Sequence, residues 1–295
     1  MSTMLARLVP SPSRRSLRAL GYMTLPMGLL LCFFVGPLVT LVDKSFRWEL
    51  LSERTGFTLQ NYTHIFTDHV YVHIFVQTAE IATIAMAVAL LIAFPLAYVL
   101  AFRSNRLEIP LLLLLVLADQ LNPMVRIYAW RMLLGKEGLI NSTLMTLHII
   151  HQPIAALLFS RFSVITVLVT GSIVYTSIPI YASMKAVDRR LFEAARDLGA
   201  SWPQTIRRVL LPLVAPGIFI SIVLVFIPLF TEFATPGLVG GRSGYMIGNT
   251  IAELISSTGE FGGGTAMSIV LLAAAGLFSV LAFAMTRMKT LETAA

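Results

Sequence analysis

Apolar residues form six long runs along the chain, and polar segments separate them. The runs cover approximately residues 22–42, 74–102, 109–128, 162–181, 213–233 and 265–285. A helix needs about 20 residues to cross a hydrocarbon core of ~30 Å, and each run is close to that length. The pattern therefore predicts an all-α polytopic membrane protein with six transmembrane helices, the second of them interrupted by Pro95.

The segments outside the runs leave no room for a separate soluble domain. We expect an N-terminal tail over residues 1–21 and one transmembrane domain over 22–295, with a core at 74–286. Residues 131–161 are expected to be partly helical beside the membrane. The glycine-rich stretch 236–264 is expected to hold a short helix near 247–254.

The composition supports a membrane protein. Hydrophobic residues make up 57% of the 295 residues, charged residues only 13%, and the mean hydropathy is +0.81. Soluble domains carry about 25% charged residues. The only cysteine, Cys32, lies in the first apolar run, so an intrachain disulfide is excluded and a cysteine-histidine metal site is not expected.

The basic residues gather in alternate polar segments. Most of the 22 lysines and arginines lie in the N-terminal tail, in loops 103–108 and 185–208, and after the sixth run. The positive-inside rule places these segments, and hence both termini, in the cytoplasm. The net charge of +7 then needs no nucleic-acid partner.

The polar loop 183–212 reads as two short helices that meet at a corner. Asp188 suits the N-cap of the first helix, and Gly199 suits its C-terminal stop. Ser201 and Gln204 form a capping box for the second helix, which Pro212 is expected to end. Such a loop suits a docking element, although an amphipathic loop on the lipid headgroups would show a similar pattern.

The same loop carries a family resemblance. Its Glu-Ala-Ala motif, the glycine that follows and the closing Leu-Pro resemble the EAA loop of permease subunits in binding-protein-dependent ABC importers, with Val209 where that family prefers isoleucine. The resemblance implies the type I ABC importer permease (MetI-like) fold and a coupling helix that docks on an ATPase. The coupling residues that it implies are Glu193, Ala194, Ala195, Asp197, Gly199, Ala200, Leu211 and Pro212.

Catalytic chemistry is not expected in this chain. Gly135-Lys136 lacks the upstream glycine and the hydroxyl residue of a phosphate-binding loop, and no nucleophile has an obvious base. We expect no catalytic residue, no metal and no cofactor in the chain. The resemblance implies a bacterial inner-membrane complex with a second homologous permease, two ATPase subunits that bind ATP and Mg²⁺, and a periplasmic binding protein.

Acidic residues near the apolar runs are candidates for a substrate pathway, because a charge inside a bilayer is costly unless it faces a cavity or a partner. Asp119 and Glu232 could attract a cation; Glu80 is a weaker candidate. A structural role is the alternative, for example an ion pair between Asp119 and Arg126, seven positions later and on the same helix face. The candidate pathway residues are Asp119, Asn122, Arg126, Tyr128, Trp130 and Glu232.

A second resemblance concerns the substrate. Residues 57–62, 125–141, 226–241 and 246–251 look like the spermidine/putrescine branch of these permeases. This implies a small polar, cationic solute such as a polyamine. The chain departs from that branch at Ala118-Asp119-Gln120, where the branch carries an aromatic cluster.

Other substrates and other classes of protein therefore stay open. Another small solute, such as an amino-acid derivative or an opine, would fit the same family. An ion-coupled secondary carrier could use Asp119 and Glu232 as ion ligands, and a membrane receptor or scaffold could use the loop to recruit a partner. Neither of these two classes needs a loop that docks on an ATPase.

Overall fold

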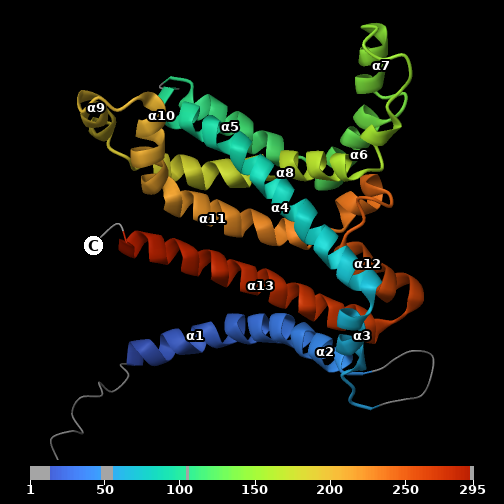
Figure 1. The fold of residues 1–295 in the computed structure, drawn as a ribbon. Helices are drawn as coiled ribbons and strands as arrows, with labels where there is room; N and C mark the ends of the chain where they lie inside the picture. The colour runs from blue at the N-terminus through green and yellow to red at the C-terminus, as the bar shows by residue number, and fades with distance from the viewer. Residues whose placement is uncertain (1–13, 48–55, 104–105, 293–295) are drawn as a thin grey trace, which may run out of the picture.

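The computed structural model describes residues 14–47, 56–103 and 106–292, and within them the chain is almost entirely helical (Figure 1). The helices are α1 (Arg14–Leu30), α2 (Gly36–Ser45), α3 (Gln60–Thr67), α4 (His69–Tyr98), α5 (Glu108–Asp119), α6 (Pro123–Leu134), α7 (Leu139–Thr146), α8 (Arg161–Lys185), α9 (Arg190–Asp197), α10 (Trp202–Thr205), α11 (Leu211–Phe230), α12 (Ile247–Glu253) and α13 (Phe261–Glu292). Shorter π and 3₁₀ turns lie at η2 (Leu31–Val35), η3 (Val99–Arg103), η4 (Ala155–Leu157), η5 (Ile206–Leu210), η6 (Pro236–Gly240) and η7 (Leu254–Thr258). The one β-bridge in these ranges joins Arg47 and Phe57.

Five continuous helical segments in the described part of the chain are long and apolar enough to cross a membrane. They are Tyr22–Ser45, His69–Arg103, Arg161–Lys185, Trp202–Phe230 and Phe261–Leu281. A sixth crossing is present if the bent pair of Glu108–Asp119 and Pro123–Thr146 is counted as one span. The prediction of an all-α protein with several transmembrane helices is confirmed.

The third predicted span is not the single helix that its apolar run indicated. Helix α5 stops at Asp119, and the next helical segment leaves at an angle of 87°. Twelve residues of helix extend only about 18 Å, which is too short for the hydrocarbon core. Pro123 explains the break, because a proline forces the preceding residue, Asn122, into an extended conformation. The Asn122 side chain then caps α6 by accepting a hydrogen bond from the Met124 amide at 2.9 Å.

Two prolines do not have the effect that the sequence predicted. Helix α4 runs through Pro95 and continues into the π turn at Val99–Arg103, so the span is not interrupted. Pro212 does not end a short helix, since the helical run is continuous over Trp202–Phe230. The π turn η5 directly precedes Pro212, and a widened turn accommodates a residue that has no N–H to donate.

Small residues let the central spans approach closely. One face of α4 packs into the bundle through a row of alanines that have no exposed surface: Ala82, Ala85, Ala89, Ala93 and Ala97. On α11, a Cβ atom at Gly217 would lie 2.6 Å from the carbonyl oxygen of Pro179 on α8. Between helices in lipid there is little hydrophobic driving force, so close van der Waals contact of this kind holds the bundle together.

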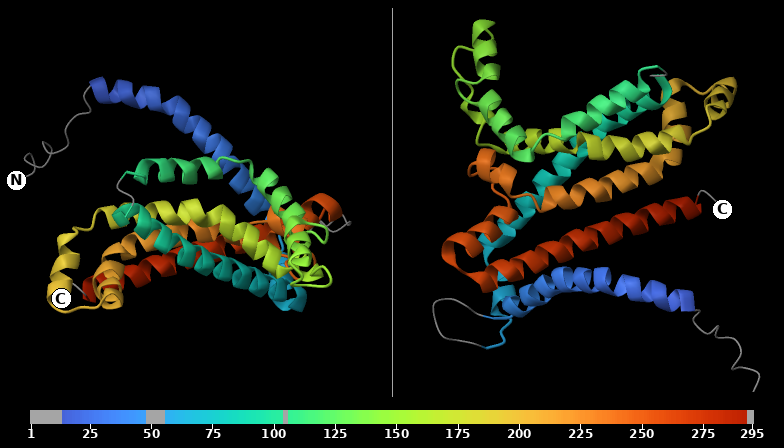
Figure 2. Two further views of the ribbon diagram at one scale, coloured as in Figure 1. Left: turned by 90° about the horizontal axis from the view of Figure 1, so that it is seen from above. Right: turned by 180° about the vertical axis from the view of Figure 1, so that it is seen from behind.

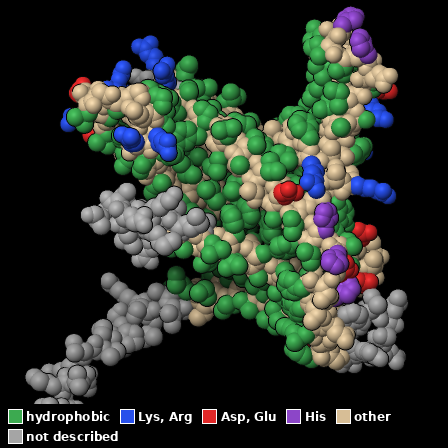
Figure 3. Space-filling view, in the orientation of Figure 1, with side chains coloured by type: hydrophobic (Ala, Val, Ile, Leu, Met, Phe, Trp, Pro, Cys, Tyr) green, Lys and Arg blue, Asp and Glu red, His purple; other side chains and the backbone are tan. Residues whose placement is uncertain are grey.

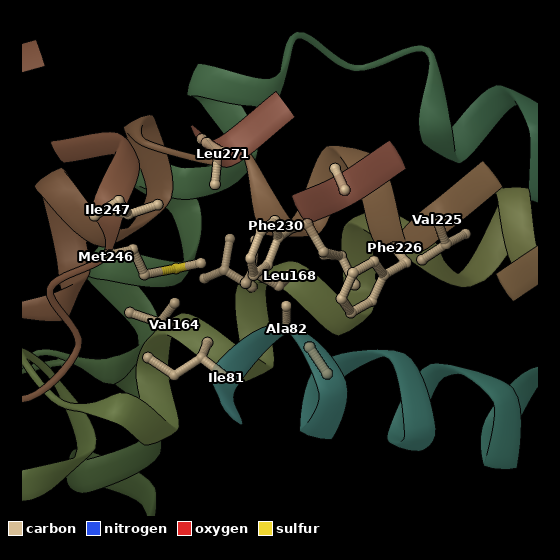
Figure 4. Packing of buried hydrophobic residues seen from close by; sticks show 14 of the residues in the cluster. Ile81, Ala82, Val164, Leu168, Val225, Phe226, Phe230, Met246, Ile247 and Leu271 are labelled. Atoms are coloured by element: carbon tan, nitrogen blue, oxygen red, sulfur yellow. The ribbon is translucent and has the colours of Figure 1, made fainter. Parts of the chain in front are cut away.

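The largest buried cluster includes Ile65 of α3 and Ile247 of α12, so it extends to the end of the bundle that holds these helices (Figure 1). Leu168 of α8 and Phe226 and Phe230 of α11 meet in this cluster with Met246 and with Leu271 of α13 (Figure 4). A smaller cluster lies at the opposite end, next to the loop between α8 and α11, and contains Ile180, Met184, Leu210 and Val214 together with Ala93, Ala97 and Ala101.

The first span is peripheral. No residue of its most apolar window is buried, and its contacts with the rest of the bundle are made by α2, which packs on α13 and is hydrogen-bonded to α3 through Ser45 (Figure 2). Residues 1–13 of the predicted tail lie outside the described residues, whereas residues 14–21 are already helical. The described ends of α1 and α13 lie at the same end of the bundle as α9, as an even number of crossings requires (Figure 1).

Charge separates the two ends of the molecule. In Figure 3 a group of lysines and arginines surrounds α9 and α10, while the histidines and most acidic side chains lie at the opposite end together with the other basic side chains in view. Hydrophobic side chains cover the surface between them. This distribution agrees with a membrane protein whose basic end holds the polar loop.

Candidate functional site

The turn after α9 is a complete Schellman motif. Gly199 has φ +80°, its amide donates to the Arg196 carbonyl at 2.8 Å, and the Ala200 amide donates to the Ala195 carbonyl at 3.0 Å. Both bonds satisfy carbonyls at the end of the helix, and the positive φ suits glycine. The predicted stop at Gly199 is confirmed.

The side chains predicted to cap the two helices of the loop form hydrogen bonds there. Asp188 Oδ1 accepts a hydrogen bond from the Arg190 amide at 3.0 Å and so closes the turn that leads into α9, one residue ahead of Arg189, which directly precedes the helix. The side chain of Gln204 accepts from the Ser201 amide at 2.9 Å, which forms the capping box of α10. The sequence therefore determines the shape of this corner locally.

The loop presents its motif residues to solvent. Glu193, Ala194 and Asp197 are exposed, and Ala195 and Ala200 are half-buried. Leu211 and Pro212 follow at the start of α11 and are also exposed. Leu198, which the motif does not include, is 89% exposed, the largest exposed fraction of any large hydrophobic residue in the described chain. Leu198 is thus an apolar side chain at the tip of an otherwise polar loop.

Four aromatic rings join the loop to the end of α4 and to the π turn η3 that continues it. Phe192 of α9 packs edge-on against Phe102 at 5.2 Å between ring centroids, and Trp202 of α10 packs edge-on against Tyr98 at 5.5 Å. Tyr98 and Phe102 lie 5.2 Å apart, and the Arg189 guanidinium lies 5.8 Å from the Phe102 ring. Both arms of the loop are thus packed on one helix end, which couples loop position to α4.

Asp119 and Arg126 form an ion pair across the break between α5 and α6. Arg126 Nη1 lies 3.4 Å from Asp119 Oδ1, and the two side chains are 23% and 8% exposed. The predicted pairing is confirmed, but the predicted reason is wrong, because the two residues lie on different helices. Asp119 ends α5, where the helix dipole disfavours a negative charge, so a nearby cation is needed.

Arg126 also lines a cavity of about 460 Å³ between α6, α8, α11 and the segment that follows α11. Most of the wall is apolar, and its polar or flexible positions are Arg126, Gly171, Ser172, Tyr175, Glu232 and Thr235. A volume of this size suits a small organic solute. The structure thus brings two of the predicted pathway residues, Arg126 and Glu232, to one cavity.

Glu232 is fixed in the wall of this cavity through one oxygen. Its Oε1 accepts hydrogen bonds from the amides of Ala234 and Thr235 at 3.1 and 3.0 Å, and from the Thr235 hydroxyl at 3.3 Å. Among the described residues no partner is found for Oε2. The carboxylate is therefore oriented by one oxygen while the other stays available.

The remaining candidates have structural surroundings. Asn122 caps α6, Trp130 packs against the main core, and Tyr128 is 51% exposed; none of the three lines the cavity. Glu80 lies 3.1 Å from Arg161 in an exposed ion pair.

That pair belongs to a polar cluster at the histidine-rich end. Arg161 also donates to the Gln77 side chain and to the Ser243 carbonyl, at 3.0 Å in both cases. Nearby, the Tyr245 hydroxyl donates to Glu253 at 2.7 Å, and burial together with this bond raises the pKa of Tyr245 to about 12. The cluster joins α4 and α8 to the segment before α12.

Sequence reasoning missed three features of these sites: the aromatic rings at Tyr98 and Phe102, the exposed Leu198, and Gly171. Gly171 leaves room for an arginine, because a Cβ there would lie 2.8 Å from Nη2 of Arg126. No local pattern pairs residues 126 and 171, so only the tertiary structure could reveal this contact.

A bundle of membrane-spanning helices, with a capped polar loop at one end and a cavity among α6, α8 and α11, defines a polytopic membrane protein. The chain belongs to the family of binding-protein-dependent transport system inner membrane components, whose model matches residues 3–289. It is thus a multi-pass inner-membrane ABC importer permease.

Two relatives and one solved structure illustrate the match. The chain is 33% identical over 253 residues to the spermidine/putrescine transport system permease protein PotB of Escherichia coli, covering 85% of this chain and 91% of the relative. It is 34% identical over 223 residues to PotB of Haemophilus influenzae, covering 75% and 77%. The crystal structure of a bacterial alginate ABC transporter in complex with an alginate pentasaccharide-bound periplasmic protein shares the fold, with a TM-score of 0.77 at 17% identity over 94% of this chain and 96% of that chain.

Proposed function

We propose that this permease carries a small polycationic solute of the polyamine class, such as spermidine or putrescine, across the inner membrane. The similarity to PotB over most of both chains is the observation that supports this substrate class. Glu232 in the cavity wall, and Asp119, which pairs with Arg126 of that wall, fit a cationic solute, since an ammonium that leaves water needs a compensating carboxylate.

The energy for transport comes from a separate ATPase that binds ATP and Mg²⁺. The exposed loop around Glu193 and Leu198 docks on that subunit, and ATP-driven closure moves the loop. The rings at Tyr98 and Phe102 then carry the movement into α4, and the spans change between the two open states. The basic end of the molecule, which contains the loop and the described ends of α1 and α13, faces the cytoplasm.

A second, homologous permease completes the pathway, and a periplasmic binding protein delivers the solute. The unburied apolar surface of Tyr22–Ser45 supports such a partner together with lipid, because nothing else in the described chain covers it. Within the chain, the loop residues named from the sequence act in coupling, and Asp119, Arg126 and Glu232 are the pathway candidates that lie at or beside the cavity. Selectivity rests first on the binding protein and then on the cavity.

The test is ATP-dependent uptake of labelled spermidine by proteoliposomes that contain the purified complex and its binding protein. Glu232→Gln is the informative variant, because the amide oxygen keeps the acceptor that holds the loop while the charge is lost. A charge-assisted contact is worth about 1.5–3 kcal/mol, so uptake should fall roughly tenfold or more.

Glu80→Gln is the matched control, since this exposed acid lies outside the cavity, and it should keep wild-type uptake. Complex yield is measured for both variants. No spermidine uptake by the wild-type complex would remove the polyamine assignment, and full uptake by Glu232→Gln would remove that acid from the pathway.

A further inference from the structure

The contact between Arg126 and Asp119 is an incomplete ion pair. Charge-assisted N–H···O bonds are usually 2.7–2.9 Å long, and arginine commonly binds a carboxylate through two parallel bonds. Here one guanidinium nitrogen approaches one carboxylate oxygen at 3.4 Å. Nε of Arg126 is buried and has no hydrogen-bond partner within the described residues. The guanidinium is held by charge, but its hydrogen-bonding capacity is poorly used.

The position of the pair favours movement of the arginine. The two residues lie on either side of the break between α5 and α6, and Arg126 faces a cavity of about 460 Å³. Gly171 supplies the space beside the guanidinium, since any larger residue would contact it. Glu232 lines the same cavity and has an oxygen available. A side chain that leaves Asp119 therefore has both room and a second acid to approach.

We propose that Arg126 is a built-in counter-cation that occupies Asp119 when no substrate is present and is displaced by an ammonium group of the incoming solute. This inference rests on the proposed cationic substrate. Asp119 stays compensated before and during passage, which avoids an unpaired charge inside the membrane. A substrate that held the acid permanently could not leave, whereas an arginine that returns to Asp119 promotes release.

The same arrangement selects for solutes with more than one positive charge. A tethered guanidinium competes at the high effective concentration of an intramolecular group, so a single ammonium displaces it poorly. A polyamine engages Asp119 and Glu232 together and gains the advantage of two linked contacts. Arg126 thus acts as a specificity-determining residue for the valence of the substrate.

The experiment measures the melting temperature of the purified complex, without binding protein, as spermidine or ethylamine is titrated. Arg126→Gln removes the resident cation, so spermidine should stabilise this variant at roughly tenfold lower concentration than the wild type, and ethylamine should begin to stabilise it. The double variant Asp119→Asn with Arg126→Gln should lose both responses. Arg161→Gln is the control, because it removes an arginine that pairs with an acid outside the cavity.

Gly171→Ala provides a second, charge-conserving route to the same result. Its Cβ would lie 2.8 Å from Nη2 and displace the guanidinium, so spermidine should stabilise this variant more readily than the wild type even if Arg126→Gln fails to assemble. Equal spermidine responses in the wild type, Arg126→Gln and Gly171→Ala would overturn the proposal. So would a response that survives the loss of Asp119.

This readout is separate from the test of transport. An amine binds an emptied carboxylate site whatever the natural substrate is. A wild-type complex that fails to import spermidine would reject the polyamine assignment, while the melting data would still decide whether Arg126 occupies an exchangeable site.

Discussion

Gly199 allows the coupling role of the loop to be tested with a predictable energetic cost. Its φ of +80° lies in the left-handed region, and a Cβ there would meet no atom within 4 Å. A substitution therefore adds backbone strain and no steric clash. The strain for an L-residue is roughly 1–2 kcal/mol, with a β-branched residue at the upper end.

That strain should reduce docking of the loop on the ATPase. One to two kcal/mol changes an equilibrium by a factor of about 5–30. We expect Gly199→Val to lower the amount of ATPase that copurifies with the permease, and ATP-dependent uptake, by roughly fivefold or more. Gly199→Asn should be milder, because asparagine tolerates the left-handed conformation.

Gly259 is the matched control. It has φ +71° and equally open surroundings, but it ends η7 at the other end of the molecule. Gly259→Val carries the same strain and should leave ATPase recovery unchanged, with membrane insertion normal for both variants. Undiminished recovery and uptake in Gly199→Val would refute the assignment of this turn to coupling, and equal losses in both valine variants would show a general loss of stability.

Two further predictions concern packing and orientation. Gly217→Ala should destabilise the permease by roughly 1–3 kcal/mol, because the added Cβ approaches a backbone carbonyl of α8 to 2.6 Å. The control is Gly276→Ala, whose Cβ meets nothing within 4 Å and which should be neutral or slightly stabilising. The melting temperatures of the two variants are compared in detergent, and equal values would reject the close approach of α8 and α11. In a Cys32→Ser background, a cysteine at Arg196 should be protected from an impermeant thiol reagent added to spheroplasts, and one at Glu137 should react; the reverse pattern would place the loop outside the cytoplasm.

The sequence by itself determined the elements whose cause is local. The apolar runs predicted the spans, because helix length and hydropathy alone decide whether a segment can cross a bilayer. Asp188, Gly199 and Ser201 determined the corner of the polar loop, since caps and a left-handed turn involve neighbours only a few residues away. Family membership could be inferred from the same residues.

Other features depended on contacts between distant residues. The apolar run from 109 to 128 gave no hydropathy signal of its break, and the structure places a bend of 87° there. Pro95 and Pro212 looked like interruptions, but the helical run continues through both; the π turn η5 directly precedes Pro212, whereas α4 simply runs through Pro95. At both positions, packing of the whole helix in the bundle offsets the free-energy cost of the hydrogen bond that proline cannot donate.

The cavity between α6, α8 and α11 shows most clearly which features the sequence predicts and which only the folded structure reveals. The sequence named Asp119, Arg126 and Glu232 from their charge in an apolar setting, and it placed the first two on one helix face. The tertiary structure instead joined Asp119 and Arg126 across a helix break, added Gly171 beside the guanidinium and brought Glu232 to the same cavity. The free-energy cost of a charge in lipid depends on the residue type and on the apolar segment around it, so it can be inferred from the sequence. Which groups compensate that charge depends on how α6, α8 and α11 pack, and only the folded bundle decides that.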